Sequence, residues 1–159
     1  MTSSSRSRHL IGLISDTHGE LRPAVHSALA GVELILHAGD VGGDEILQEL
    51  RLIAPVHAVA GNTDLPGTYE PELLVTVGGV RIHVSHGHEL GGPTPKKLAA
   101  AYDADVIVYG HTHQQLVTRL DGRLVVNPGA AGPARFKLKP SVGLLTISAE
   151  RADVEIIAL

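Results

Sequence analysis

Five short apolar runs in this 159-residue chain are each followed by an aspartate, an asparagine or a histidine. The runs are LIGLIS, ELILHA, VHAVA, VRIHVS and DVIVYG, at residues 10–15, 33–38, 56–60, 80–85 and 105–110. Most are continuously apolar, which is typical of strands covered on both faces, as in a mostly parallel α/β sheet. Amphipathic stretches predict helices over 23–30, 44–54 and 94–102. The chain is therefore predicted to fold as layers of α and β structure.

The remaining apolar runs predict an antiparallel part of the fold. Gly78-Gly79 inside 73–86 and Asp121-Gly122 are signals for tight hairpins. Further strands are predicted over 115–120, 123–127, 141–148 and 152–158. Residues 1–9 are interpreted as a flexible tail and residues 10–159 as one domain. A chain of this length buries roughly 70 % of its unfolded surface.

Composition excludes several classes of protein. The chain has no cysteine, so it forms neither disulfides nor thiolate metal sites, which fits a cytoplasmic location. The run Leu10–Ile14 is too short for a signal sequence or a membrane span. A net charge of −4 argues against a general nucleic-acid binder, and the one basic cluster, Arg135–Lys139, is thin support for a basic groove.

The polar residues at the strand ends have the composition of a metal site. In α/β sheets, ligands bind at the carboxyl ends of strands, so these side chains are predicted to converge. They are Asp16, His18, Asp40, Asn62, His86, His111 and His113. Imidazoles and carboxylates without sulfur suit Mn, Fe, Ni, Co or Zn better than Ca. Seven ligands exceed one four-coordinate ion, so two ions are predicted, with one carboxylate shared.

The spacing of His111 and His113 supports two ions. Residues i and i+2 at a strand end point to the same side, about 6.5 Å apart along the chain. Each histidine is therefore predicted to serve a different ion of a pair roughly 4 Å apart. Two divalent ions, two aspartates and one hydroxide leave a centre of about +1, which attracts a phosphate ester.

Six ordered motifs, DTH, GDV, GNTD, SHGH, GHTH and NPG, resemble those of calcineurin-like metallophosphoesterases. The resemblance covers residues 10 to about 136 and is closest to the small single-domain bacterial and archaeal phosphodiesterase branch, to which the retromer vacuolar-sorting subunit is related. It implies a four-layer α/β/β/α sandwich. It also implies one ion bound by Asp16, His18, Asp40 and His113, and a second bound by Asp40, Asn62, His86 and His111.

The activity implied by the resemblance is hydrolysis of a small phosphodiester or phosphomonoester. A hydroxide that bridges the ions attacks phosphorus in line with the leaving group, and Asp40 bridges the same ions. Mn²⁺ is the expected metal, and Ni²⁺, Fe²⁺, Co²⁺ and Zn²⁺ are also compatible. Asp40, Asn62 and His88 are the predicted catalytic residues, and Asn127 and Arg135 the predicted substrate contacts.

One position departs from the family pattern. Several members carry a histidine directly after the asparagine, where it acts as a general acid, whereas this chain has Thr63. Without that imidazole a poor leaving group is harder to protonate, which favours diesters or activated esters. His88 and Asp64 are the two candidate replacements.

Two other functions stay open at this point. The fold also serves as a protein-binding scaffold in the retromer subunit, and a metal-dependent nuclease would need a basic groove. Complete occupation of all seven ligand positions favours catalysis. No membrane partner is expected, and a homo-oligomer is compatible with the sequence.

Overall fold

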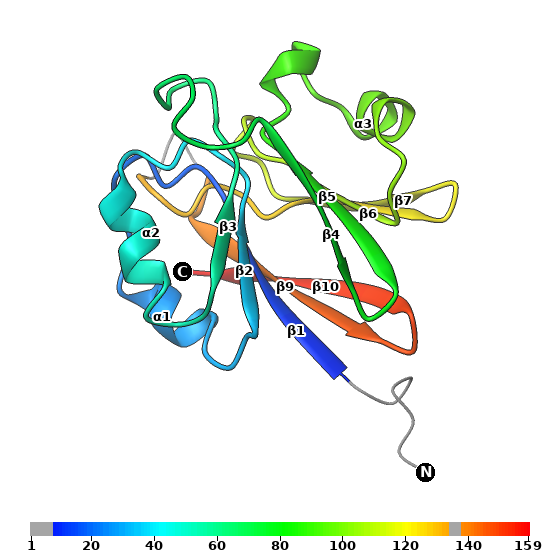
Figure 1. Ribbon diagram of the computed structural model, residues 1–159, viewed down its shortest axis with the longest axis horizontal. Coiled ribbons are helices and arrows are strands. Elements are labelled where there is room, and N and C mark those ends of the chain that lie inside the picture. Colours follow the sequence, from blue (N-terminus) through cyan, green and yellow to red (C-terminus); the bar gives the residue numbers. More distant parts are fainter. Residues whose placement is uncertain (1–7, 134–137) are drawn as a thin grey trace.

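The computed structural model describes residues 8–133 and 138–159. Two five-stranded sheets lie face to face, with helices on the outer faces (Figure 1). The elements are β1 (Arg8–Ile14), α1 (Ala24–Ala28), β2 (Leu34–His37), α2 (Asp44–Leu50), β3 (Val56–Ala58), β4 (Glu72–Val77), β5 (Val80–Ser85), the 3-10 helix η2 (His88–Leu90), α3 (Pro95–Ala101), β6 (Val106–Val108), β7 (Leu116–Leu120), β8 (Arg123–Asn127), β9 (Ser141–Ser148) and β10 (Arg151–Ala158).

The first sheet has the order β10-β9-β1-β2-β3. Strands β1, β2 and β3 are parallel, and β9 and β10 continue the sheet in antiparallel fashion. Helices α1 and α2 connect the parallel strands and pack on one face of this sheet, with Leu29 and Leu50 against Ile14 and Ile35. The β1 strand begins at Arg8, earlier than the predicted run, because its first residues pair with the end of β9.

The second sheet has the order β4-β5-β6-β8-β7. Its central strands β5, β6 and β8 are parallel, and the two edge strands are antiparallel to their neighbours. Helix α3 covers the outer face, where Leu98 packs with Ile107 and Val125. Figure 1 shows α1 and α2 on one side of the molecule and α3 on the other. This confirms the predicted four-layer α/β/β/α sandwich.

The core between the two sheets consists of aliphatic side chains. Ile11 and Leu13 of β1 alternate towards this core, while Ile14 faces the helices, so β1 is covered on both faces. The continuous apolar runs of the sequence are therefore explained by burial on two sides. Aromatic residues make up only 3 % of the chain, and branched aliphatic residues fill the space instead.

Both predicted hairpins are confirmed. Gly78 and Gly79 join β4 to β5 with φ of 55° and 81°, and Asp121 and Gly122 join β7 to β8 with φ of 50° and 79°. Two successive positive φ angles match the twist of the flanking strands, and glycine and aspartate tolerate them best. The second predicted helix, 44–54, ends at Leu50. Beyond Leu50 the chain continues in tighter turns, in which the Leu52 and Ile53 N–H groups donate to the carbonyls of Glu49 and Leu50.

Among the described residues, no helix is long and apolar enough to cross a membrane.

Candidate metal centre

The seven predicted ligands lie at the carboxyl ends of strands from both sheets. Asp16, His18, Asp40 and Asn62 follow strands of the first sheet, and His86, His111 and His113 follow strands of the second. The cluster therefore forms only when the two sheets pack against each other. The position of these residues after predicted strands of an α/β sheet was the basis for expecting convergence, and the structure places them in one region.

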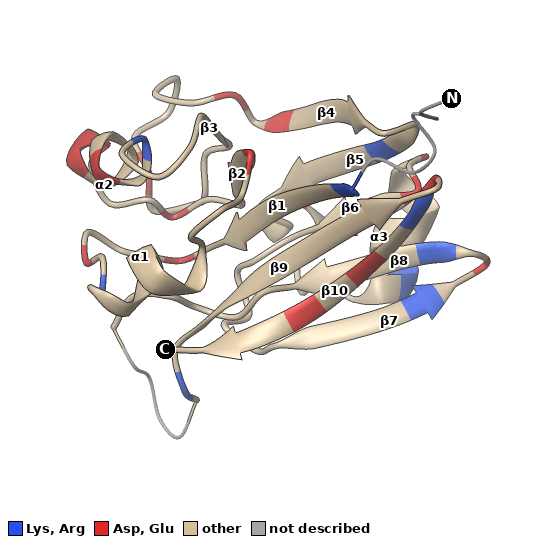
Figure 2. Ribbon diagram, turned by 90° about the horizontal axis from the view of Figure 1, so that it is seen from below, with Lys and Arg blue, Asp and Glu red and all other residues tan. Residues whose placement is uncertain are grey.

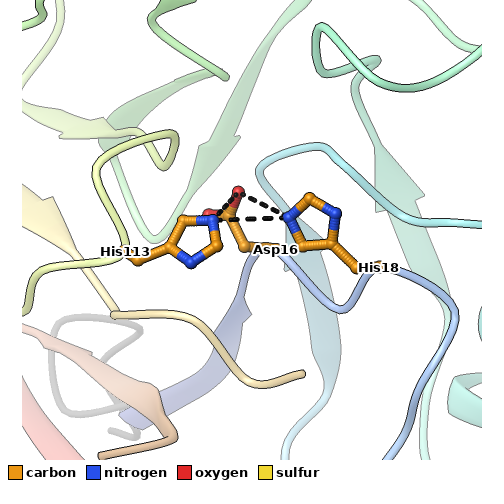
Figure 3. Close-up of side chains that lie close together, drawn as sticks. All are labelled: Asp16, His18 and His113. Carbon is orange, nitrogen blue, oxygen red and sulfur yellow. Dashed lines mark hydrogen bonds and ion pairs between the residues drawn. The ribbon is translucent and has the colours of Figure 1, made fainter. Parts of the chain in front are cut away.

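Asp16, His18 and His113 form the first group. Asp16 Oδ1 lies 3.4 Å from His113 Nε2 and 3.7 Å from His18 Nε2. The two imidazole Nε2 atoms are 3.3 Å apart, and all three side chains point towards one another (Figure 3). Ligand atoms held about 2.1 Å from one ion lie roughly 3 to 3.5 Å from one another. The spacing of these three atoms therefore fits a first-row divalent ion.

Asp16, Asp40 and His86 form a second group next to the first. His86 Nε2 lies 3.2 Å from Asp40 Oδ2 and 3.7 Å from Asp16 Oδ1. Asp40 Oδ2 is also 3.6 Å from His18 Nε2, so it lies between histidines of both groups, as expected of a bridging carboxylate. Asp16 Oδ1 also lies between the two groups, and the sequence did not indicate that Asp16 belongs to both.

His111 and Asn62 lie beside the second group. The His111 ring stands edge-on to the His86 ring, with 5.3 Å between ring centroids. His111 Nδ1 is 3.3 Å from Asn62 Oδ1. The neighbouring His113 ring instead contacts that of His18, with centroids 5.2 Å apart. The two histidines of the GHTH motif therefore face different groups, as their spacing predicts.

Three buried polar atoms of the centre have no hydrogen-bond partner among the described residues: Asp16 Oδ1, His86 Nε2 and His113 Nδ1. The other polar atom of each side chain is bound. Asp16 Oδ2 accepts from Ser15 Oγ at 2.7 Å and from the His111 backbone N–H at 3.2 Å. His86 Nδ1 donates to the Ala38 carbonyl at 2.8 Å, which leaves a lone pair on Nε2 of the neutral ring. This is how metal-binding histidines are oriented, so the residues fit a metal ion.

The charge of the centre also favours cations. Burial by itself raises the pKa of Asp16, but the neighbouring His113 and His18 lower it well below its ordinary value. Burial likewise raises the pKa of Asp40, yet the contacts of His86 and the Thr63 backbone N–H lower it to about 2. Both side chains are therefore carboxylates at neutral pH. Although burial lowers the pKa of His86, the same carboxylates raise it above its usual value.

The backbone of five ligands adopts a conformation that is rare outside glycine. Asp16, His18, Asp40, His111 and His113 have φ of 53°, 47°, 55°, 71° and 64°. Positive φ in residues other than glycine is uncommon, and it clusters at functional sites. Each strand turns sharply at its end, which directs consecutive polar side chains into the same region. No signal in the sequence predicted these conformations.

Asp64 anchors the loops that carry two of the ligands. Its carboxylate accepts hydrogen bonds from the backbone N–H groups of Val41, Gly42 and Gly61, at 3.0, 3.2 and 2.8 Å. The suggestion that Asp64 replaces the missing general acid is therefore wrong, because its oxygens are occupied within the protein. Thr63 is exposed, and its backbone N–H donates to Asp40 Oδ1 at 2.9 Å.

His37 connects the loop after β1 with the loop after β2 through buried hydrogen bonds. Its Nδ1 accepts from the Gly39 backbone N–H at 3.1 Å, so Nε2 carries the proton and donates to Thr17 Oγ1 at 3.0 Å. Thr17 Oγ1 in turn donates to the Val41 carbonyl at 2.7 Å. Burial lowers the pKa of His37 to about 4, so the ring stays neutral. It orients the Gly-Asp turn as well as packing in the core.

The structure places Asn127, a predicted substrate contact, and His88 in different surroundings. Asn127 is fully buried; its Nδ2 donates to the Gly110 carbonyl and to Thr112 Oγ1, and its Oδ1 accepts from the Gly129 backbone N–H. Asn127 therefore fixes the backbone of the GHTH loop, and its contact with substrate stays a prediction. Arg135 lies outside the described residues. His88 is partly exposed, and its ring centroid lies 5.4 Å from that of His86.

Comparison of this chain with known proteins identifies similarity to one protein family. The calcineurin-like phosphoesterase superfamily domain matches residues 10–150. A probable metallophosphoesterase of Methanothermobacter thermautotrophicus is 40% identical over 158 residues, which cover 93% of this chain and 91% of that protein. A phosphodiesterase of Methanocaldococcus jannaschii is 30% identical, over 75% of this chain and 82% of its own length. A mutant Vps29 from Entamoeba histolytica superposes with a TM-score of 0.78 at 26% identity, covering 94% of this chain and 99% of that one.

Proposed function

Because this chain belongs to the calcineurin-like phosphoesterase superfamily, we propose that it is a dinuclear metal-dependent phosphodiesterase. The observation that carries the proposal is the pair of buried, unpartnered atoms Asp16 Oδ1 and His86 Nε2, which lie 3.7 Å apart. A carboxylate oxygen and an imidazole nitrogen that face each other in a buried site are costly unless positive charge lies with them, either a proton on the imidazole or a metal ion.

The two groups of side chains suggest how two ions are divided. We assign the first ion to Asp16, His18, Asp40 and His113, and the second to Asp40, Asn62, His86 and His111. The position of Asp40 Oδ2 between His86 and His18 supports its role as the shared ligand. Mn²⁺ as the native metal and a cytoplasmic location stay predictions.

The ions, when bound, supply Lewis-acid activation of the phosphoryl group and a nucleophile derived from water. The chain itself orients these ligands through Ser15, His37 and Asp64. His88 is the remaining candidate for a proton donor to the leaving oxygen. It is partly exposed beside His86 and His111, with 6.3 Å between the ring centroids of His88 and His111. Among the described hydrogen bonds, none joins the His88 ring to a backbone group, so no such bond commits the ring to another role.

The test of this function is hydrolysis of bis(p-nitrophenyl) phosphate by metal-stripped protein, with and without added Mn²⁺. Turnover is expected only after metal is restored, because the chain offers no other activated nucleophile in the centre. If no first-row ion restores turnover although two ions bind, catalysis is excluded for this ester and the scaffold function gains support.

Replacement of Thr63 by histidine is expected to accelerate hydrolysis of diesters with poor leaving groups by about a hundredfold, the lower range for general acid catalysis. The exposed side chain leaves room for an imidazole, and the backbone N–H that holds Asp40 is unchanged. The measurement compares kcat for diphenyl phosphate and bis(p-nitrophenyl) phosphate in the wild type, Thr63→His and the control Thr63→Asn. An equal gain on both esters contradicts a missing general acid.

Within residues 8–133 and 138–159, the distribution of charge gives no support to the nuclease alternative. Figure 2 shows the basic segments of β7 and β8 next to acidic segments of β10. Arg119 lies 3.2 Å from Asp153, and Arg123 lies 3.3 Å from Asp103. These arginines are paired with acids, whereas a polyanion needs a stripe of free positive charge.

A further inference from the structure

A pocket of about 450 Å³ adjoins the metal centre. Asn62 and His88 form the wall that it shares with the centre. The loop between β3 and β4, which carries Asn62, also contributes Pro66, Tyr69 and Pro71 to the lining. Its volume falls within the range of pockets for small molecules, about 300–1,000 Å³. A group attached to a phosphoryl unit in the centre would therefore have space to enter it.

The walls of this pocket favour an uncharged ring. Two proline rings contribute apolar surface to the lining, and the phenol ring of Tyr69 can stack on an aromatic group. None of the described residues that line the pocket is a lysine or an arginine. Of its two carboxylates, Asp64 is occupied by backbone N–H groups, whereas Glu89 is 39% exposed. A second negative charge on the substrate would meet the Glu89 carboxylate, and the neighbouring His88 ring is already paired with that carboxylate, with 3.7 Å between His88 Nδ1 and Glu89 Oε1.

We propose that this pocket binds one ester arm of the substrate, and that this arm is an uncharged aromatic ring such as an aryl group or a nucleobase. The inference rests on the proposed phosphodiesterase function and adds the substrate class. It follows that diesters with a single phosphate and a neutral ring are preferred over those with an additional phosphate or carboxylate. Tyr69 is the residue that determines this preference.

The test uses phosphonates, because their carbon–phosphorus bond is not hydrolysed and binding is measured at equilibrium. Calorimetry with Mn²⁺-loaded protein compares phenylphosphonate with methylphosphonate, which differ only in the arm. The wild type is expected to bind the phenyl compound about fivefold to tenfold more tightly, the gain expected of one aromatic contact. Tyr69→Ala is expected to reduce this ratio to near one, and Tyr69→Phe, which keeps the ring, to preserve it.

Leu65→Ala is the matched control. Leu65 lies on the same loop, is 77% exposed and does not line this pocket, so the ratio should equal that of the wild type. The proposal is overturned if the wild type binds both phosphonates equally, or if Tyr69→Ala leaves the ratio of their affinities unchanged. In either case, metal-dependent hydrolysis of bis(p-nitrophenyl) phosphate continues. If neither phosphonate binds and that hydrolysis is also absent, it is the phosphodiesterase function that fails.

The preference for an uncharged ester arm is tested separately. 4-Carboxyphenylphosphonate is expected to bind several-fold more weakly than phenylphosphonate to the wild type, and Glu89→Gln to reduce that difference. Equal binding of the two compounds by the wild type contradicts the requirement for an uncharged arm.

Discussion

Replacement of Asp40 by asparagine is expected to lower metal-dependent hydrolysis of bis(p-nitrophenyl) phosphate by about a thousandfold, since loss of a metal ligand removes several kcal/mol of transition-state stabilisation. Asp40 Oδ1 accepts from the Thr63 backbone N–H, and Oδ2 faces His86 and His18. An asparagine has only one oxygen. Either the Thr63 N–H loses its acceptor, or an NH₂ group replaces the oxygen that faces the ions.

The fold should survive this substitution. Loss of one buried hydrogen-bonded group costs about 1–3 kcal/mol, against a total stability of roughly 5–15 kcal/mol. The measurement therefore combines kcat with metal content and a thermal melt. Asp153→Asn is the control, because Asp153 is an exposed carboxylate on β10 that lies outside the centre. Turnover of Asp40→Asn within tenfold of the wild type would contradict the bridging role.

Saturation with Mn²⁺ is expected to bind two ions per chain and to raise Tm by roughly 10 °C or more. An ion at a hundred times its Kd stabilises a protein by about 2.7 kcal/mol. For a domain of this size, each kcal/mol shifts Tm by about 2–4 °C. The physical reason is the metal-free centre itself, where Asp16 Oδ1 and His86 Nε2 are buried without hydrogen-bond partners among the described residues.

Calorimetry gives the number of ions, and a melt at increasing Mn²⁺ gives the stabilisation. Ca²⁺ is the control ion, because it prefers oxygen ligands and four of the seven ligands are imidazoles, so its shift should be smaller. Asp16→Asn is expected to lose most of the shift, since Asp16 Oδ1 belongs to both groups. A single ion per chain would contradict a dinuclear centre.

The assembly of the centre links its chemistry to the packing of the fold. The carboxylates come from the first sheet, and three of the four imidazoles come from the second. The core of Ile11, Leu13, Ile82 and Val84 between the sheets therefore determines the distance between acids and histidines. A cavity in this core would be expected to affect metal binding as well as stability.

Most of the strands and the candidate ligands could be predicted from local sequence patterns. Continuous apolar runs identified the strands because both faces of each central strand are buried, and Gly78-Gly79 and Asp121-Gly122 identified the hairpins because their φ angles are positive. The candidate ligands could be predicted because a polar residue after each apolar run must lie at a strand end. These are local patterns, which neighbouring residues specify.

The contacts of each polar atom follow from the packing of segments that lie far apart in the sequence. Asp64 was one of two candidates for the missing acid and Asn127 a predicted substrate contact; in the structure Asp64 accepts from the Val41 backbone N–H and Asn127 donates to the Gly110 carbonyl. The sharing of Asp16 Oδ1, the positive φ of five ligands and the pocket beside Tyr69 also arise where distant strand ends meet. Hydrogen bonds and close packing at such a junction depend on the position of one sheet relative to the other, and no local pattern encodes that position.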